Sequence, residues 1–328
     1  MLTILHVSDL HFGPPFQEQV GEALLRFAHR LQPELIVASG DFTQRARPEQ
    51  FAAARVFLDR FPPAPLVVTP GNHDVPLYRV AERLFDPYRY YHEHISKELD
   101  SVTRLPDAVV VALNSTAPRR AIVNGRIHRW QLDFAREAFT DVPPDMFRIV
   151  VAHHHFAPPP DFEKAAAMMK AKRALDAFTA MRVDLVLGGH LHRAYLGNSL
   201  DVYAGMDREH GIVIVQSGTS TSRRGRARER EKNSFNVIRI DGRLIRVTHY
   251  MYFDVADGFL PTSRHIFYRG GRPPIEGESM EAGAYWDESE GIELELELPL
   301  RSDPESRGEA SGAALGCRSD SGRDEGAS

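Results

Sequence analysis

Short runs of apolar residues recur through the first two thirds of the chain, and each run ends in glycine or in polar residues. The runs are rich in Val, Ile and Leu, which is typical of strands buried on both faces. They predict strands over residues 2–7, 35–38, 66–69, 109–113, 147–152 and 183–187. Between them, apolar residues recur at helical spacing over residues 20–31, 48–58, 130–139 and 161–180. Strands that alternate with helices favour an α/β fold with a parallel sheet and right-handed crossovers.

Residues 75–104 depart from this alternation. Two short helices are expected there, separated by Asp86-Pro87, in a segment rich in tyrosine and histidine. These side chains could cap an active site and stack on a base, or could pack into the core as part of a helical insertion. The pattern leaves both open for Tyr88, Tyr90, Tyr91 and His92.

The last third of the chain changes character. Strands are predicted over residues 212–216, 235–240 and 244–250, and Asp241-Gly242 indicates a hairpin between the last two. Beyond about residue 268, glycine, proline, glutamate and serine dominate, although residues 292–298 alternate apolar and acidic side chains as an edge strand does. From residue 301 onward too little apolar surface remains to offset the entropy of ordering, so we expect disorder.

Polar side chains that can bind metal ions follow five of the predicted strands, at the sheet edge where α/β proteins place their ligands. The metal-donor candidates are Asp9, His11, Asp41, Asn72, His153, His190 and His192. Carboxylate, amide and imidazole without thiolate suit Mn, Fe, Zn or Co rather than a calcium site. Seven candidates exceed one tetrahedral shell, so two ions that share a carboxylate are the natural interpretation. In extended backbone, residues two apart point the same way, so Asp9 with His11, and His190 with His192, can each converge on one ion.

Each of these clusters has a simpler explanation when it is taken alone. Asp9 or Asp41 would more often be a turn or helix-capping residue, and a single histidine is more often an ordinary surface or core residue. Five such clusters at successive strand ends are difficult to explain by capping together. In the run His153-His154-His155 we expect His153 to be the ligand because it leaves the strand first, with His154 as the alternative.

Composition narrows the function classes. The chain has 328 residues, a net charge of −5 and a pI near 6.3, so no global charge favours nucleic acid or a membrane surface. The single cysteine, Cys317, excludes an intramolecular disulfide and a cysteine-ligated metal site. No apolar run reaches membrane-spanning length and no signal peptide is recognisable, so we expect a cytoplasmic protein without a membrane partner.

The strand-end motifs resemble the five ordered motifs of the calcineurin-like metallophosphoesterases. They are Asp9-x-His11, Gly40-Asp41, Gly71-Asn72-His73-Asp74, the strand-end His153 and Gly189-His190-x-His192. The resemblance spans about residues 1–250 and implies a four-layer αββα sandwich with a small helical insertion and a binuclear site between the sheets. We therefore expect a metallophosphoesterase domain at residues 1–268 with its helical cap at 75–104, a C-terminal extension at 269–300 and a disordered tail at 301–328.

The resemblance also implies a role for each motif residue. The first of two divalent ions would be held by Asp9, His11, Asp41 and His192. The second would share Asp41 and be completed by Asn72, His153 and His190. Of the remaining motif residues, His73 would face the phosphate or the leaving group, and Asp74 would orient His73.

The implied activity is hydrolysis of a phosphate ester by a hydroxide that bridges the two ions. The motif Gly40-Asp41-Phe42-Thr43-Gln44 is similar to that of bacterial cyclic-nucleotide phosphodiesterases, so a small phosphodiester such as a 3′,5′-cyclic nucleotide is the expected substrate. A nuclease or a phosphomonoesterase of the same superfamily is the alternative, with nucleic acid less favoured because a sustained basic stripe is lacking. A non-catalytic binding scaffold is a further alternative, which the complete set of motif residues argues against.

One basic segment remains open to two interpretations. Residues 223–230 contain Arg223, Arg224, Arg226, Arg228 and Arg230, with Glu229 among them. Guanidinium groups bind phosphate bidentately, so the segment could be a clamp for phosphate or a nucleotide. Arginine mixed with glutamate is also typical of a solvated loop, and the sequence slightly favours that interpretation.

Overall fold

The computed structural model describes residues 1–119, 123–158, 167–202, 210–226 and 229–271. All of them belong to the first of two compact units, Met1–Ser279. The predicted edge strand at 292–298 and the predicted tail at 301–328 lie outside the described residues.

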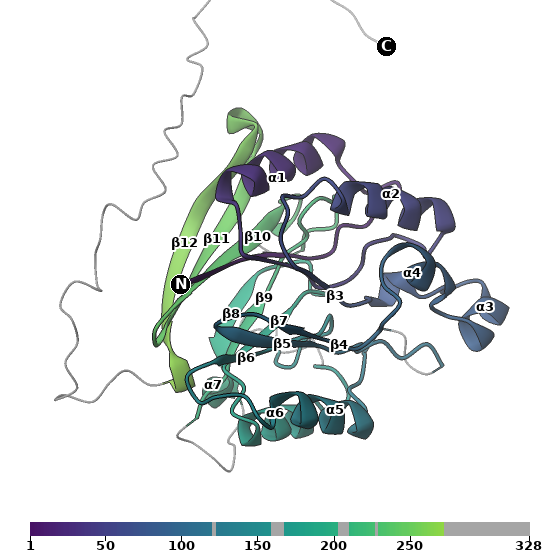
Figure 1. Cartoon of the computed structure of the whole chain (residues 1–328). Coiled ribbons are helices and arrows are strands. Elements are labelled where there is room, and N and C mark those ends of the chain that lie inside the picture. Colours follow the sequence, from purple (N-terminus) through teal and green to yellow (C-terminus); the bar gives the residue numbers. More distant parts are fainter. Residues whose placement is uncertain (120–122, 159–166, 203–209, 227–228, 272–328) are drawn as a thin grey trace, which may run out of the picture. The chain divides into compact units, whose positions relative to one another are not determined.

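Two six-stranded sheets lie face to face in this unit (Figure 1). The first has the strand order β12-β11-β10-β1-β2-β3, and the second has the order β4-β5-β6-β7-β9-β8. The strands of the first sheet are β1 (Leu2–Val7), β2 (Leu35–Ala38), β3 (Leu66–Val68), β10 (Ser234–Asp241), β11 (Leu244–Phe253) and β12 (Gly258–Tyr268). Those of the second are β4 (Ser101–Arg104), β5 (Ala108–Ala112), β6 (Phe147–Val151), β7 (Leu185–Gly188), β8 (Tyr195–Asn198) and β9 (Val213–Gln216).

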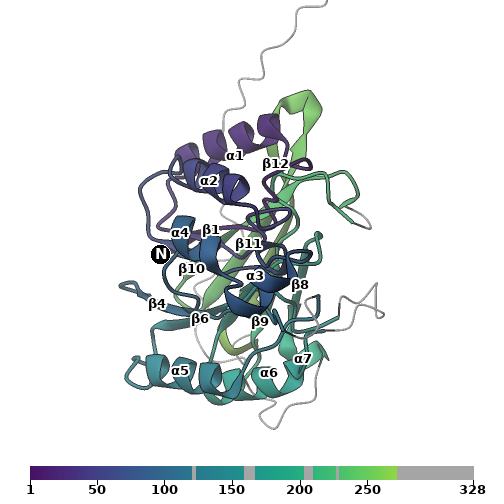
Figure 2. The ribbon, with the colours of Figure 1, turned by 90° about the vertical axis from the view of Figure 1, so that its right-hand side faces the viewer.

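Helices cover the outer face of each sheet, as Figures 1 and 2 show. The first sheet is covered by α1 (Glu18–Leu31) and α2 (Pro48–Leu58), and the second by α5 (Arg129–Phe139) and α6 (Ala171–Ala180). The remaining helices are α3 (Val80–Phe85), α4 (Arg89–His94) and α7 (Ser199–Val202), with the 3₁₀ turns η1 (Asn72–Asp74), η3 (Asp254–Ala256) and η4 (Arg269–Gly271). The four-layer αββα sandwich predicted from the motifs is confirmed.

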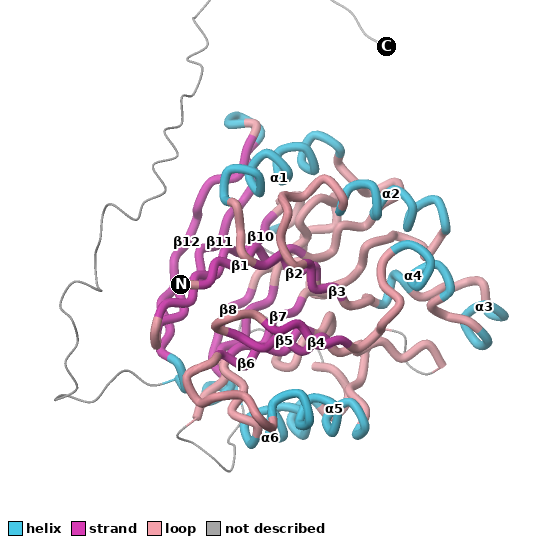
Figure 3. Tube along the Cα trace, in the orientation of Figure 1, coloured by secondary structure: helices cyan, strands magenta, loops and turns pink. Residues whose placement is uncertain are grey.

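The strands of the two sheets are drawn in magenta in Figure 3. In the second sheet parallel strands form the centre and one antiparallel strand is added on each side, whereas in the first sheet the parallel strands form one side and the antiparallel strands form the other. In the first sheet β1, β2 and β3 are parallel, and in the second β5, β6, β7 and β9 are parallel. The carboxyl ends of neighbouring parallel strands meet at one edge of a sheet. Loops that follow β1, β2 and β3 are therefore brought together, as are those that follow β6 and β7.

Strand β5 shows how the core is built in layers. Val110 and Ala112 point between the two sheets and pack with residues of β1, β2 and β6. Val109 and Val111 point the other way and pack with side chains of α5 and α6. Because both faces of the strand are covered, the sequence is continuously apolar instead of alternating.

Within the described residues, the long helix predicted over 161–180 is wrong over 167–170. Residues 159–166 lie outside the described part of the chain, and α6 begins only at Ala171. Lys170 before it has a left-handed backbone with φ of 63°, which interrupts a helix. Met168 and Met169 belong to the preceding segment, and Met169 forms a bridge with Arg126. The prediction included this segment because its apolar residues happen to follow helical spacing.

The two short helices predicted for residues 75–104 are present as α3 and α4. Tyr91 of α4 is fully buried and packs edge-on against Phe51 and at a tilt against Phe42. Tyr88 is also partly buried, where its hydroxyl forms hydrogen bonds with Thr116 and Asn114. For these two tyrosines the structure therefore supports the packing interpretation rather than base stacking in an open cap.

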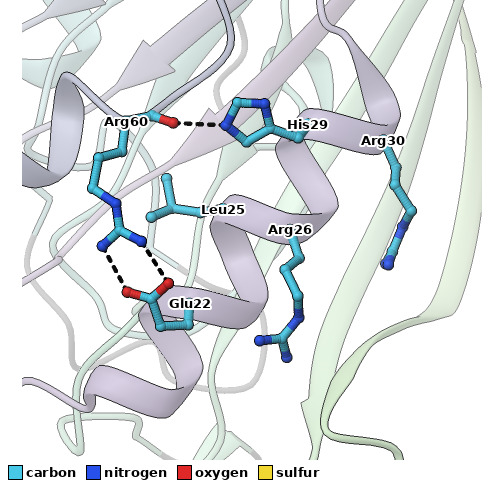
Figure 4. Close-up of a pocket in the computed structure, with 6 residues that line it drawn as sticks. All are labelled: Glu22, Leu25, Arg26, His29, Arg30 and Arg60. Carbon is cyan, nitrogen blue, oxygen red and sulfur yellow. Dashed lines mark hydrogen bonds and ion pairs between the residues drawn. The ribbon is translucent and has the colours of Figure 1, made fainter.

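A shallow cavity of about 390 Å³ lies on the outer side of α1 (Figure 4). Arg60 forms a bidentate ion pair with Glu22 across it, with both nitrogen–oxygen distances at 2.6 Å. His29 contacts the carbonyl oxygen of Arg60 at 2.8 Å. The paired charges join α1 to the end of α2, so we assign this cavity a structural role.

Among the described residues, no helix has both the length and the apolar composition needed to cross a bilayer.

Replacing Val110 by alanine tests the packing between the sheets. Val110 is fully buried, so losing two methyl groups should lower the free energy of unfolding by about 2 kcal/mol. The matched control is Val255→Ala, because Val255 is 97% exposed and should change stability by less than about 0.5 kcal/mol. Urea denaturation followed by circular dichroism measures both variants. Equal stability of the two variants would contradict the two-sheet core.

Candidate active site

The predicted donor residues lie directly after strands, in turns with an unusual backbone. Five of them have positive φ, a conformation that non-glycine residues rarely adopt. They are Asp9 (54°), His11 (51°), Asp41 (54°), His190 (73°) and His192 (55°). Left-handed backbone at so many residues of one site indicates stored strain of the kind that clusters at functional sites.

Hydrogen bonds between these turns fix their relative positions. In the first sheet the Asp9 amide donates to the carbonyl of Gly40 at 3.0 Å, and the His11 amide donates to the carbonyl of Asp41 at 2.9 Å. A third bond connects the two sheets, because the His190 amide donates to Oδ2 of Asp9 at 2.9 Å. The turns therefore hold each other as one unit at the edge of the sandwich.

A first cluster of donor atoms is formed by Asp9, His11, Asp41 and His192, whose ligand atoms all lie within 4.8 Å of one another. Oδ1 of Asp9 is 3.2 Å from Nε2 of His192 and 3.6 Å from Nε2 of His11. Oδ2 of Asp41 is 3.7 Å from the same His11 nitrogen. Donor atoms bound to one ion at about 2.1 Å lie about 3–4 Å apart, so these separations fit a shared cation.

A second cluster shares Asp41 with the first. Nε2 of His153 lies 3.4 Å from Oδ2 of Asp41 and 3.3 Å from Oδ1 of Asn72. Nδ1 of His190 is 2.9 Å from the same Asn72 oxygen. The neighbouring His154 contacts the hydroxyl of Ser115 through Nδ1 at 2.8 Å. The structure thus brings together all seven predicted donors, with His153 rather than His154 beside Asp41.

Of the two residue pairs that spacing alone could place on one ion, the structure brings only one together, and it divides the other as the family resemblance implies. Asp9 and His11 do share one cluster, but His190 lies beside Asn72 while His192 lies beside Asp9. Residues two apart point the same way only in extended backbone, and His190 and His192 have left-handed φ instead. The His190–His192 pair therefore divides between the two clusters instead of converging on one ion.

Two buried carboxylate oxygens show that the site fits divalent cations. Oδ1 of Asp9 and Oδ2 of Asp41 are buried and accept no hydrogen bond within the described part of the chain. A buried ionised oxygen without a partner is costly, and a cation is the compensation that the surrounding imidazoles and the Asn72 amide can accommodate. Both oxygens face the donor clusters, so the residues present fit metal ions.

The charge states of most donors also suit metal binding, which needs ionised carboxylates and neutral imidazoles. Burial alone would raise the pKa of Asp9, but the neighbouring His192 and His11 outweigh it and lower the pKa to about 2. Burial lowers the pKa of His192 to about 3, although Asp9 opposes this shift. Burial also lowers the pKa of His190 well below its usual value. His153 differs, because Asp41 outweighs burial and raises the pKa of His153 to about 9, so metal binding there must displace a proton.

Backbone carbonyls hold three of the imidazole rings from behind. Nδ1 of His153 lies 2.8 Å from the carbonyl oxygen of Ser39, and Nδ1 of His192 lies 2.9 Å from that of Arg224. Nδ1 of His73 lies 2.9 Å from the carbonyl oxygen of Gln44. Such contacts orient the ring and leave its other nitrogen facing the site. Sequence reasoning missed them, since every residue has a carbonyl and no side-chain signal marks those that are used.

His73 and Asp74 occupy different positions in the site. The His73 ring packs edge-on against His11 at 4.9 Å between centroids, and its amide donates to Oδ1 of Asp41 at 2.7 Å. Asp74 is buried, and its carboxylate accepts hydrogen bonds from the amides of Phe42, Thr43 and Gly71. Asp74 therefore stabilises the turn that contains Asp41. We expected Asp74 to orient the ring of His73, but the contact with that ring comes from the carbonyl of Gln44.

Gly71 is required by the close approach of its backbone to Asp41. A Cβ atom at this position would lie 2.1 Å from Oδ1 and 2.4 Å from the amide nitrogen of Asp41. Any side chain here would push away the carboxylate that both clusters share.

A cavity of about 280 Å³ opens onto the donor clusters. Its lining includes donor residues, apolar side chains and arginines: Gln44, Arg45, Asn72, His73, Val75, Leu77, Val123, His190, His192, Arg224 and Arg226. The arginines of residues 223–230 therefore differ in their position relative to the cavity. Arg224 and Arg226 face the cavity, Arg223 and Arg230 are exposed, and Arg228 lies outside the described residues.

Comparison with known proteins agrees with the fold. Among solved structures, the chain is similar to a purple acid phosphatase, PPD1, from yellow lupin (Lupinus luteus), with a TM-score of 0.58 and 10% identity over 85% of this chain. The match spans only 57% of the lupin protein's length. A dimetal phosphatase from Danio rerio matches with a TM-score of 0.55 and 11% identity, over 82% of this chain and 99% of that protein.

At these identities the two likenesses show the fold alone. No curated protein matches the sequence. The family model described as calcineurin-like phosphoesterase matches residues 2–194, which is more than half of the chain. The chain therefore belongs to the calcineurin-like phosphoesterase family.

Proposed function

We propose that this protein is a metal-dependent phosphodiesterase that hydrolyses small phosphodiesters, with 3′,5′-cyclic nucleotides as the candidate substrates. The observation that carries the proposal is a cavity of about 280 Å³ lined by the imidazoles of His73, His190 and His192, next to buried carboxylate oxygens of the donor clusters that accept no hydrogen bond within the described residues. This volume lies near the lower end of the range for small-molecule sites, which supports a small substrate over a polymer.

Two divalent ions, of Mn, Fe, Zn or Co, are proposed as the cofactors. One would be held by Asp9, His11, Asp41 and His192, and the other by Asp41, Asn72, His153 and His190. When bound, such ions polarise the phosphoryl group and provide a nucleophile near neutral pH. The protein supplies the geometry, since the carboxylate of Asp41 belongs to both clusters and Gly71 leaves room for it.

His73 is proposed to serve the leaving group. Its Nδ1 is engaged by the Gln44 carbonyl, so in the neutral ring the proton stays on Nδ1 and Nε2 is the nitrogen that exchanges a proton. Because His73 lines the cavity, its protonated form, with a proton on each ring nitrogen, can donate the Nε2 proton to the oxygen that departs from phosphorus and thereby become neutral. Asp74 supports this arrangement indirectly, because it holds the turn that carries Asp41 and Gln44.

A phosphomonoesterase is the second candidate, and the arginines in the cavity favour it because a monoester carries more negative charge than a diester. A nuclease remains the less favoured alternative on the acidic net charge of −5. A non-catalytic scaffold is less favoured still, because every donor of the motif set is present. We propose a small phosphorylated molecule as the partner and retain the cytoplasm as the proposed location.

Removing metal should abolish hydrolysis of bis(p-nitrophenyl) phosphate. Dialysis against a chelator is expected to lower kcat by at least about a thousandfold, since without the ions only positioning by the protein remains. Re-addition of Mn, Fe, Co or Zn separately should restore activity and identify the effective ion. Release of p-nitrophenol measures both steps. Full activity after complete metal removal, verified by elemental analysis, would overturn the proposal.

Asp41→Asn should release bound metal while the fold is retained. The substitution keeps the size of the side chain but removes the charge shared by both donor clusters, so affinity for divalent ions should fall by at least about a hundredfold. Elemental analysis after gel filtration measures the metal content. Asp133→Asn on α5 is the control, because Asp133 is exposed and should leave metal content unchanged. Wild-type metal content in Asp41→Asn would rule out the shared role.

His73→Ala should affect poor leaving groups most. Cleavage of a 3′,5′-cyclic nucleotide expels an alkoxide, so kcat should fall by about a hundredfold or more. A p-nitrophenyl ester expels a stable phenolate, and its kcat should fall by less than about tenfold. The metal content should stay at the wild-type level, and exposed His265→Ala is the control. Equal losses for both leaving groups would place His73 outside leaving-group chemistry.

A further inference from the structure

Three arginines line the same cavity as the donor clusters: Arg45, Arg224 and Arg226. They come from two loops that are far apart in the sequence, one after β2 and one before β10. Within the described residues, none of the three forms an ion pair with a carboxylate, and the described lining of the cavity contains no acidic side chain. The cavity wall therefore carries a surplus of positive charge.

Arg224 is the most constrained of the three. Its side chain is half-buried, and its Nη1 donates to the side-chain oxygen of Gln44 at 2.8 Å. A neutral amide satisfies one of the five guanidinium N–H groups but does not compensate the charge. A cation removed from water without an anionic partner is costly, and an anionic ligand is the compensation that the cavity admits. Gln44 in turn holds His73 through its carbonyl, which places Arg224 beside the reacting end of the cavity.

The backbone around these arginines is set before any ligand binds. The carbonyl of Arg224 accepts the hydrogen bond from Nδ1 of His192, and the amide of Arg226 donates to the carbonyl of His192 at 3.0 Å. Arg45 lies over the ring of Tyr78, with its guanidinium carbon 5.1 Å from the ring centroid. Preorganised donors lose little entropy when they bind, so this arrangement is suited to anion recognition.

We propose that Arg224, together with Arg45 and Arg226, forms a subsite for a second phosphate group of the substrate, separate from the phosphoryl group that reacts. The inference rests on the proposed function and adds a substrate class to it: phosphate esters that carry a further phosphate. The charge balance supports it, because a simple phosphodiester has one negative charge while three guanidinium groups face the cavity. Bidentate guanidinium–phosphate contacts provide the recognition.

Binding of two nucleotides that differ by one phosphate tests the subsite. Isothermal titration calorimetry of the metal-loaded protein compares thymidine 3′,5′-bisphosphate with thymidine 5′-phosphate. The wild type should bind the bisphosphate at least about tenfold more tightly, because it gains charge-assisted contacts. In Arg224→Ala the ratio should fall to about one to two, and Arg226→Ala should reduce it in part. Since Arg226 is exposed and, among the described residues, forms hydrogen bonds through its backbone alone, its substitution is expected to leave the fold intact.

Arg223→Ala is the matched control. Arg223 belongs to the same loop and carries the same charge, but it is exposed and does not line the cavity, so the wild-type ratio should remain. Metal content, measured for each variant, separates loss of the subsite from loss of the donor clusters. Arg224→Lys should recover part of the ratio, because it restores the charge without the bidentate geometry.

Three outcomes would overturn the subsite: equal affinity of the wild type for both nucleotides, no measurable binding of either, or an equal loss for both in Arg224→Ala. The last result would assign Arg224 to the reacting phosphoryl group instead. These outcomes are independent of turnover. If the protein binds metal and shows the predicted preference but hydrolyses no phosphodiester, the proposed function fails while the subsite stands. If it hydrolyses bis(p-nitrophenyl) phosphate without the preference, only the subsite fails.

Discussion

The carboxylate of Asp41 is the group on which the rest of the site depends. It is fully buried, and its Oδ2 faces His11 and His153 without receiving a hydrogen bond in the described part of the chain. An ionised carboxylate in such surroundings requires nearby positive charge, because desolvation otherwise costs several kcal/mol. Without metal, the charge is provided by the imidazole of His153, whose pKa Asp41 raises to about 9 against the effect of burial. A divalent ion takes over this role, so metal binding, proton release and stability are linked.

The scaffold supports this carboxylate at a conformational cost. Asp9, His11, Asp41, His190 and His192 all have left-handed backbones, and each such residue costs about 1–3 kcal/mol. The strain persists because buried strands fix the chain immediately before each turn, and the turns are hydrogen-bonded to one another. Strands β1, β2 and β7 are buried on both faces between helices and the opposite sheet. A rigid, apolar sandwich therefore compensates locally unfavourable geometry at one of its edges, which is the usual division between scaffold and site.

This division also explains what the sequence reveals. Continuous apolar runs predicted most central strands, and the donors could be identified because each follows such a run. The strands that were missed, β4, β8 and β12, lie at sheet edges, where half-buried polar residues obscure the pattern. Within the site, spacing alone could not group His190 and His192 correctly, because period-two reasoning needs extended backbone, whereas the resemblance to the family had assigned them to different ions. The carbonyls that orient His73, His153 and His192 belong to backbone positions without any compositional signal.

The arginine segment illustrates the same limit, and the structure suggests why its residues differ. By composition alone, a solvated loop and an anion-binding loop are indistinguishable, since both consist of exposed charges. Both neighbours are held through their backbone, because the amide of Arg223 donates to the carbonyl of Pro15 and the carbonyl of Arg224 contacts the ring of His192. What separates them is the side chain, since that of Arg224 is half-buried and lines the cavity, whereas Arg223 is exposed to solvent. One residue thus orients a donor through its backbone and adds positive charge to the cavity through its side chain, and under the proposed function this would couple the donor clusters to the recognition of an anionic substrate.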